Sequence, residues 1–371
     1  MEAHFGVVGI NPKLNIIGNG VVYDNQRIPD YFSQVSGIVA LAGTKYGQLH
    51  DGVNDAPKKL LEAALSSYPE MIIVDAATDT KNSDVVDETI LTGKNNTAIY
   101  NAEWVAQFCF GLHNKLYEST LRYLQLNKML PPRILVLGGD HSLAMGSISA
   151  VSDFCLAAMK LPNIKLPFIQ PDLVIVWVDA HADINTPKST VSGKLHGCPV
   201  SLLMGMNEEG WNDLTHFEWA LEKMRLRDDA WVRPNRLVYI GLRDVDEAEK
   251  ELLDKYHILQ YDMEKVRKYE RDMGRIVREA IKKVDPSGIF PIHLSFDIDG
   301  IDPIYTPSTG TPVPDGLLPE EGIEIIKLLK ETGRLVSMDL VEVNLALGNK
   351  EDVIKTLHHS KTLIDVYLSE N

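Results

Sequence analysis

Several features are scarce in this 371-residue chain, and each scarcity excludes a class of protein. Three cysteines, Cys109, Cys155 and Cys198, are too few for a disulfide framework and fit a reducing compartment. No apolar stretch is long enough to span a bilayer. The N-terminus has neither the apolar core of a signal peptide nor the arginine content of a transit peptide. We therefore expect a cytoplasmic protein whose cysteines are buried side chains rather than nucleophiles.

Basic residues are also in deficit, because 37 Lys and Arg face 52 Asp and Glu, for a formal net charge of −15. Phosphate binding needs clustered basic side chains, so this balance argues against a nucleic-acid partner. It likewise disfavours an anionic membrane surface. A hydrophobic fraction of 44% and a charged fraction of 24% are typical of an ordinary globular protein. With no internal repeat and no low-complexity linker, one domain is the simpler interpretation.

Short, continuously apolar runs recur along the chain and predict strands that are buried on both faces, as in a parallel sheet. They are Ile38–Ala42, Met71–Val74, Ile134–Leu137, Leu173–Val178, Leu237–Ile240, Ile258–Tyr261, Ile292–Phe296 and Leu335–Leu340. Helix formers with apolar residues at three- and four-residue spacing occupy Ala102–Leu126, Glu264–Lys283 and Pro319–Thr332. This alternation predicts an α/β fold with a mostly parallel sheet and helices on both sides.

Polar segments follow three of these runs: GGDH at 138–141, DAHAD at 179–183 and DID at 297–299. Alternate side chains of an extended chain share a face, so Asp179, His181 and Asp183 point the same way, and so do Asp297 and Asp299. Open α/β sheets bind ligands beyond the carboxyl ends of their strands. We therefore expect two imidazoles and four carboxylates in one crevice. These candidate metal ligands are His141, Asp179, His181, Asp183, Asp297 and Asp299.

Carboxylates at close range repel one another and take up protons unless cations compensate them. Six ligands are too many for one four-coordinate zinc ion with an open position. They suit two ions that share bridging carboxylates, and the oxygen-rich set favours Mn²⁺. Such a pair would supply hydroxide near neutral pH by lowering the pKa of a bridging water. The alternative is that DAHAD caps a strand and DID forms a turn, but their occurrence together favours the metal site.

Five segments carry a resemblance to a known family: GGDHSLAMGSISA, WVDAHADINTP, SGKLHGCPVS, GLRDVDEAE and SFDIDGIDPIYTPSTGTPV. They closely resemble the arginases, within the ureohydrolase family, and the likeness runs from about Ser36 to the C-terminal helix. It implies a single three-layer α/β/α domain with an eight-stranded sheet, and a homotrimer. It also implies two Mn²⁺ per subunit, held by the same six ligands.

The resemblance further implies hydrolysis of L-arginine to L-ornithine and urea, in which a metal-bridging hydroxide attacks the guanidinium carbon. Asp183 would pass a proton to the leaving amine, and His196 would shuttle protons. Glu342 would hold the guanidinium by paired hydrogen bonds. The residues that match substrate-binding positions are Asn185 and Ser192 for the α-carboxylate, Asp246 for the α-ammonium with Asp244 and Glu249 in support, and Thr311 beside the guanidinium.

Other interpretations remain open. Without the resemblance, His196 would be a packed loop histidine and Glu342 a solvated residue. Within the ureohydrolases the alternative is agmatinase or another guanidino hydrolase. A catalytically silent member, acting as a scaffold or a metal store, would have lost ligands, and none is missing here. A nucleotide-binding protein is disfavoured because neither GxGxxG nor GxxxxGK[ST] follows a strand.

The domain boundaries follow from the same reasoning. We assign residues 1–36 to an N-terminal extension, 37–371 to the catalytic domain and 151–171, which is rich in proline, to a surface insertion. Three positions depart from the family pattern. Lys194 stands where many arginases have Asn, Cys198 occupies a variable position, and Glu320 replaces an arginine that takes part in subunit contacts of animal arginases.

Overall fold

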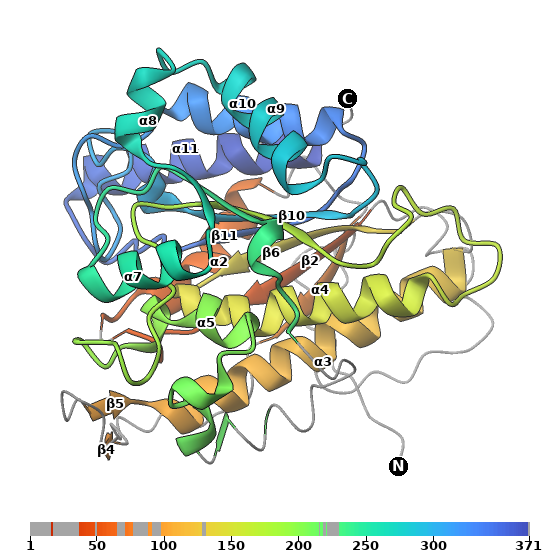
Figure 1. Ribbon diagram of the computed structural model, residues 1–371, viewed down its shortest axis with the longest axis horizontal. Helices are drawn as coiled ribbons and strands as arrows, with labels where there is room; N and C mark the ends of the chain where they lie inside the picture. The colour runs from red at the N-terminus through yellow and green to blue at the C-terminus, as the bar shows by residue number, and fades with distance from the viewer. Residues whose placement is uncertain are drawn as a thin grey trace.

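A single parallel sheet forms the centre of the molecule (Figure 1). The computed structural model describes residues 16–17, 37–48, 50–64, 71–76, 88–90, 98–127, 131–214, 216–217, 220 and 230–369. The strand order in the sheet is β1-β3-β2-β6-β11-β10-β7-β8-β9. The strands are β1 (Ile16–Ile17), β2 (Gly37–Ala42), β3 (Met71–Asp75), β6 (Arg133–Gly138), β7 (Val174–Val178), β8 (Leu237–Ile240), β9 (Leu259–Tyr261), β10 (Ile292–Asp297) and β11 (Leu335–Val341). Outside it, β4 (Glu88–Ile90) and β5 (Ala98–Tyr100) form an antiparallel pair.

Each of the eight apolar runs of the sequence forms a strand, and every pair in the large sheet is parallel. The prediction of an eight-stranded parallel sheet is therefore confirmed. The two-residue β1 adds to its edge, beside β3. Apart from β1, the N-terminal extension that we assigned to residues 1–36 lies outside the described residues.

Helices cover both faces of the sheet, so the molecule has three layers (Figure 1). The alternation of side chains along the strands creates two cores: Ile38 and Ala40 of β2 face one, while Val39 and Leu41 face the other. The first core is closed by α3 (Ala102–Asn127), α4 (Ala144–Ala158), α5 (Pro199–Leu203) and α7 (Glu247–Lys255). The second is closed by α2 (Ala56–Ala64), α8 (Met263–Lys268), α9 (Met273–Val284), α10 (Pro319–Glu331) and α11 (Lys350–Leu368).

Short 3-10 helices occupy several of the connections between these elements. Three follow or lie near the strand ends that the sequence singled out: η3 (His141–Leu143), η4 (Leu195–Gly197) and η8 (Ile298–Gly300). The others are η1 (Val53–Asp55), η5 (Asn207–Glu209), η6 (Trp211–Asp213) and η7 (Pro234–Arg236).

Two predicted segments need correction. The single helical stretch expected over Glu264–Lys283 is divided into α8 and α9, because Glu270 and Arg271 take positive φ angles of 55° and 57°. Asp272 then starts α9 by accepting a hydrogen bond from the Arg275 N–H. The proposed surface insertion at 151–171 is also too long at its start. Its first eight residues belong to α4, where several of them are buried in the first core.

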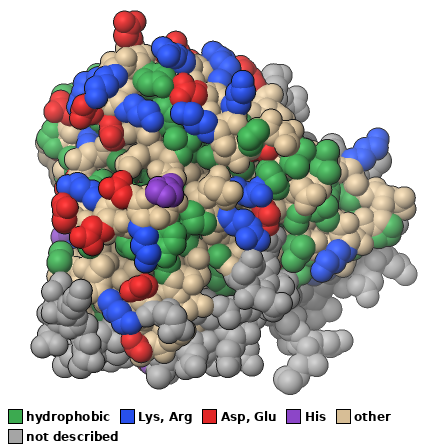
Figure 2. Space-filling view, viewed as in Figure 1, with side chains coloured by type: hydrophobic (Ala, Val, Ile, Leu, Met, Phe, Trp, Pro, Cys, Tyr) green, Lys and Arg blue, Asp and Glu red, His purple; other side chains and the backbone are tan. Residues whose placement is uncertain are grey.

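The rest of that segment, after Ala158, is a loop that projects from the body of the molecule (Figure 1). Hydrophobic side chains gather on this projection in Figure 2, and Met159 and Ile169 are exposed. Elsewhere on the same face, basic and acidic side chains are interspersed. Among the described helices, none combines the length and the apolar character needed to cross a membrane.

Candidate active site

Four neighbouring strands at the centre of the sheet, β6, β11, β10 and β7, end at one edge and carry the polar segments. Their ends are level, because Asp297 at the end of β10 pairs with Val341 at the end of β11. Asp179 follows β7 directly, Glu342 follows β11, and His141 opens η3 just after β6. The sheet topology therefore delivers these groups to one crevice at the carboxyl ends of adjacent strands.

One ring nitrogen of His141 faces three carboxylates. Its Nδ1 lies 3.2 Å from Asp179 Oδ2, 3.0 Å from Asp183 Oδ2 and 3.2 Å from Asp297 Oδ2. All four side chains are buried. Within the part of the chain that the structure describes, this nitrogen has no hydrogen-bond partner. A divalent cation between the nitrogen and the oxygens would give each of them a ligand bond, which accounts for an arrangement that is otherwise costly.

His181 forms a second group beside the first. Its Nδ1 lies 3.2 Å from Asp299 Oδ2 and 3.4 Å from Asp179 Oδ1. The ligand atoms of His141, Asp179 and Asp183 lie within 4.8 Å of one another, and so do those of Asp179, His181 and Asp299. Asp179 belongs to both groups and turns a different oxygen toward each histidine. A carboxylate shared in this way is what two adjacent ions require.

The charges in this cluster do not balance without cations. Burial and the neighbouring Asp179 raise the pKa of Asp183 to about 6, and burial with adjacent carboxylates raises the pKa of Asp297 well above its usual range. Burial also opposes ionisation of Asp179, but the adjacent imidazoles of His141 and His181 lower its pKa overall. Positive charge on the two imidazoles thus offsets part of the acidic charge. Divalent ions would offset it more fully, so the donor set fits a metal pair.

Side chains within the strands orient these ligands. Ser295 Oγ on β10 lies 2.9 Å from His141 Nε2, so the ring presents Nδ1 to the carboxylates. Trp177 on β7 stacks on the same ring at 4.2 Å and donates its Nε1–H to Asp179 at 2.9 Å. Asp183 has a φ of 50°, a region that residues other than glycine rarely adopt. Partners of this kind hold metal ligands in place. Sequence reasoning missed Ser295 and Trp177 because both lie inside apolar runs.

Glu342 is buried just beyond β11, also at a positive φ, of 60°. Its Oε1 accepts a hydrogen bond from the His141 backbone N–H at 2.9 Å and lies 3.0 Å from His196 Nδ1. Its Oε2 accepts a hydrogen bond from Gln48 Nε2 at 2.7 Å. Burial opposes ionisation of Glu342, but His196 and the His141 N–H lower its pKa overall. Burial likewise opposes protonation of His196, whose pKa is raised overall by Glu342. The two residues thus favour an ion pair.

A cavity of about 180 Å³ opens onto this cluster. Its lining residues are His181, Asp183, Asn185, His196, Gly197, Asp244, Asp246, Glu249, Asp297, Thr311 and Glu342. Six of these eleven residues are carboxylates. The cavity therefore complements a small cation better than a neutral or anionic molecule.

Asn185, Asp246 and Glu249 form a network along one side of the cavity. Asn185 Nδ2 donates to Asp246 Oδ2 at 2.7 Å. Asp246 is also the N-cap of α7, in a capping box with Glu249, so the start of this helix fixes its position. Burial, with Asp183 and Asp246 nearby, raises the pKa of Glu249 to about 8. The carboxylate of Asp246 is thus held at the cavity wall by a rigid helix end.

Three other predicted residues differ in their placement. Thr311 Oγ1 donates to Asp299 Oδ2 at 3.0 Å, so it contacts a candidate ligand directly. Asp244 lines the cavity but is 69% exposed, with Oδ2 3.8 Å from His181 Nε2. Ser192 is exposed and does not line the cavity, and its Oγ accepts a hydrogen bond from the Lys194 N–H. Most of the predicted site residues therefore line one cavity. His141, Asp179 and Asp299 contact residues that line it, whereas Ser192 does not line it.

The structure shows the surroundings of two of the positions that depart from the family pattern, Cys198 and Glu320. Cys198 is fully buried, and burial raises the pKa of its thiol well above the usual value, so it is not a thiolate nucleophile. Cys109 and Cys155 are buried as well, which confirms the sequence prediction for all three. Glu320 is exposed at the start of α10, while its neighbour Glu321 pairs with Arg271.

Comparisons with known proteins show which proteins this chain is similar to. A sequence model of the arginase family matches residues 36–363. The arginase of Saccharomyces cerevisiae is 35% identical in an alignment that covers 90% of this chain and 93% of that protein. The arginase of Glaciozyma antarctica is 40% identical over 64% of this chain and 61% of that protein. The crystal structure of Entamoeba histolytica arginase in complex with L-ornithine superposes with a TM-score of 0.69, covering 91% of this chain and 99% of that one. At 24% identity, that likeness concerns the fold.

Proposed function

Because the chain belongs to the arginase family of hydrolases, we propose that it hydrolyses L-arginine to L-ornithine and urea with two Mn²⁺ ions per subunit. The observation that supports this most directly is the double role of Asp179, which offers one oxygen to the His141 group and the other to the His181 group. His141, Asp179, Asp183, Asp297, His181 and Asp299 would hold the two ions. When bound, the ions would activate a water molecule as the nucleophile and compensate the buried carboxylates.

The remaining groups would position the substrate and move protons. Glu342, buried at the cavity wall, would accept a hydrogen bond from the guanidinium and hold its carbon in place. Asp183 also lines the cavity, and its carboxyl group would deliver a proton to the leaving amine. His196, which is partly exposed beside Glu342, would exchange protons between this wall and solvent.

The far end of the substrate would meet the Asn185–Asp246–Glu249 network. Asp246 supplies negative charge for an α-ammonium, and Asn185, already oriented by Asp246, supplies amide hydrogen bonds for an α-carboxylate. Agmatine lacks that carboxylate, so it would leave the polar groups meant for it unpaired. Unpaired buried polar groups are the basis of strong discrimination.

The direct test is a parallel urea-release assay of the manganese-loaded protein with L-arginine, agmatine and 4-guanidinobutyrate, combined with elemental analysis. We expect about two manganese ions per chain and a kcat/KM at least about a hundredfold higher for L-arginine. A higher kcat/KM for agmatine would replace this proposal with an agmatinase. Absence of bound metal together with absence of urea release would support a silent member of the family.

A substitution at Asp246 tests the substrate end separately. Asp246→Asn keeps a good N-cap for α7 but removes the charge, so we expect KM for L-arginine to rise about tenfold with a smaller change in kcat. Asp246→Ala removes both, and should raise KM further while also lowering the midpoint of thermal unfolding. A loss of kcat at unchanged KM in the Asn variant would contradict the binding role.

The assembly and location also belong to this proposal. We propose a cytoplasmic homotrimer: three buried cysteines without a disulfide among them are typical of a reducing compartment, and the family resemblance implies the trimer. Glu320, exposed on α10, replaces the arginine expected at the subunit contact, so that contact would rest on other residues. Light scattering after gel filtration would distinguish a trimer from a monomer or a hexamer.

A further inference from the structure

Gln48 is a buried amide on the loop that follows β2, two strands away from β11 in the sheet order. The loop itself is tied to the site: Gly47 N–H donates to Asp140 Oδ2 at 3.1 Å, and the Gly47 carbonyl accepts from the His196 N–H at 3.0 Å. Gln48 is 1% exposed and does not line the cavity. Its Nε2 reaches Glu342 Oε2 at 2.7 Å. Gln48 thus contacts the site through Glu342, without lining the cavity itself.

The hydrogen bonds of Glu342 show why this contact matters. A carboxylate has about four acceptor positions, two on each oxygen. On Oε1, the His141 N–H and the His196 ring occupy both. On Oε2, Gln48 occupies one. The acceptor position that remains for a substrate N–H is therefore on the oxygen that Gln48 holds.

The other polar atom of the Gln48 amide, its oxygen, makes no hydrogen bond to a described residue that would stabilise the fold. Its Oε1 is buried and has no hydrogen-bond partner among the described residues. It lies against Gly310, where an added Cβ would be only 2.9 Å away, so a larger residue at 310 would displace the amide. An unpaired buried acceptor costs free energy, and a hydrophobic side chain of the same size would avoid that cost. Retaining an amide here therefore points to a role for its Nε2–H.

We propose that Gln48 is a positioning residue, which fixes the plane of the Glu342 carboxylate so that Oε2 accepts a hydrogen bond from the guanidinium of the substrate. This inference rests on the proposed function, because it assigns Glu342 to the guanidinium end. Glu342 needs such support: its backbone lies at φ 60°, beyond the end of the strand, where the sheet does not constrain its side chain. The segments that follow two other strands, through His141 and Gln48, supply the constraint.

The test is Gln48→Met, which keeps the length of the side chain and removes the donor, in the manganese-loaded full-length protein. We expect KM for L-arginine to rise about tenfold, the effect of losing one hydrogen bond to a charged group. L-Ornithine has no guanidinium, so its inhibition constant should stay within about twofold of the unaltered protein's. When Gln48→Met is added to a Glu342→Gln variant, kcat/KM should fall by less than about twofold relative to Glu342→Gln alone, because the two residues act as a unit.

A matched control is Gln107→Met on α3. This substitution also removes an amide-to-carboxylate hydrogen bond, the one from Gln107 to Glu103 at 2.9 Å. It should leave both the KM for L-arginine and the inhibition constant of L-ornithine unchanged. If Gln48→Met does not fold, as judged by thermal unfolding, Gln48→Asn keeps the amide but withdraws it from Glu342 and should raise KM likewise. Unchanged KM in a folded Gln48 variant, or equal weakening of L-arginine and L-ornithine, overturns the inference. Failure of the unaltered protein to hydrolyse L-arginine would instead overturn the proposed function.

Discussion

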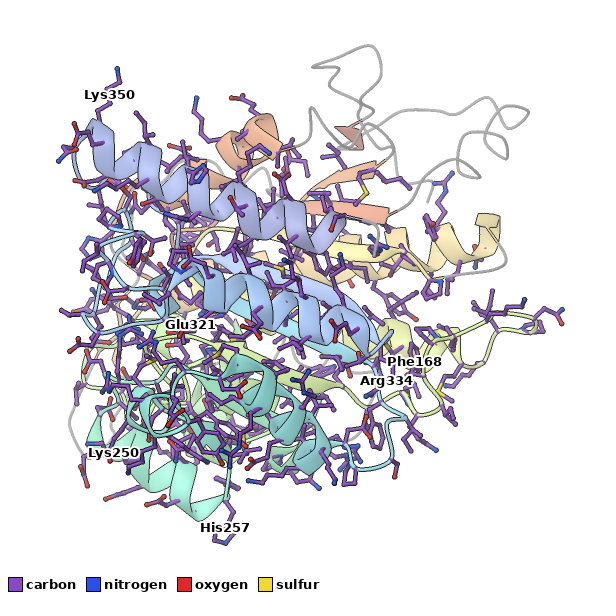
Figure 3. All side chains as sticks on the ribbon, turned by 90° about the horizontal axis from the view of Figure 1, so that it is seen from above. Phe168, Lys250, His257, Glu321, Arg334 and Lys350 are labelled. Carbon is purple, nitrogen blue, oxygen red and sulfur yellow. The ribbon has the colours of Figure 1, made fainter. Side chains whose placement is uncertain are left out.

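The two ends of the central sheet both bury carboxylates, but they compensate them differently. At the amino end, Asp285 is 3% exposed and accepts a hydrogen bond from Arg334, which is itself buried and leads into β11. At the carboxyl end, Asp179, Asp183 and Asp297 converge on one imidazole nitrogen, and no described arginine or lysine forms an ion pair with them. Figure 3 shows Arg334 on the opposite side of the molecule from Lys250 and Lys350, whose helices follow the loops of the site.

The difference separates what stabilises the fold from what serves its chemistry. A buried acid paired with arginine needs nothing from outside, and removing one partner leaves an uncompensated charge. Acids that converge without a cation of their own destabilise the protein until a cation is bound. Such clusters of acids are retained because the site has to be ready to bind the cation. Metal binding and folding are therefore expected to be coupled at the carboxyl end and independent at the amino end.

The largest effect is expected from Asp297→Asn. Asn keeps the Oδ1 acceptor for the Asp299 N–H but removes a ligand charge, so metal affinity and kcat/KM should each fall at least about a hundredfold. In the metal-free protein, by contrast, the same substitution should stabilise the fold. Burial and neighbouring acids raise the pKa of Asp297, so the metal-free variant should be more stable than the metal-free unaltered protein.

Urea unfolding with and without chelator, together with elemental analysis, measures both effects. Asp285→Asn at the amino end is the matched control, since the same substitution there should destabilise the protein and leave the manganese content unchanged. Equal destabilisation of metal-free protein by both substitutions would remove the distinction between the two ends.

The next effect in size concerns the amino end. Arg334→Met leaves Asp285 as an unpaired buried charge, and the unfolding free energy should fall by about 3–5 kcal/mol. Adding Asp285→Asn should recover most of that loss, because an amide needs no counter-ion. Urea unfolding of the single and double variants gives the comparison. Their KM for L-arginine should match that of the unaltered protein, and a changed KM would show that the two ends are coupled.

The parts of the molecule that could be predicted from sequence are those with a repeated or charged pattern. All eight large strands appear as apolar runs, because strands buried on both faces carry little else. The six candidate ligands stand out because acids and histidines that cluster directly after buried strands are costly to bury unless they bind a cation. Cys198 was expected to be buried, and it is.

The remainder depends on distance in space, which local sequence does not encode. Gln48 is an uncharged residue in a loop, and its link to Glu342 spans 294 positions. Ser295 and Trp177 look like packing residues until the sheet places them against His141 and Asp179. The break between α8 and α9 was hidden by helix formers on both sides, and it depends on two residues with positive φ. Asp246 was predicted as a substrate residue, but its role as a helix cap was not.

The smallest effect should come from a carboxylate that is paired at the surface rather than buried. Glu279 on α9 contacts Lys283, Tyr261 and Tyr269, and these partners lower its pKa to about 2 from its usual 4.5. A lowered pKa in the folded state adds stability above about pH 4.5, which is lost as the pH falls toward about 2 because the unfolded chain takes up the proton first.

Glu279→Gln should therefore lower the midpoint of thermal unfolding at pH 7 by less than about 2 °C, since solvent screens such pairs. Between pH 7 and 3 the difference from the unaltered protein should shrink. A difference that grows on acidification, or one as large as that of Arg334→Met, would show that exposure does not rank these carboxylates.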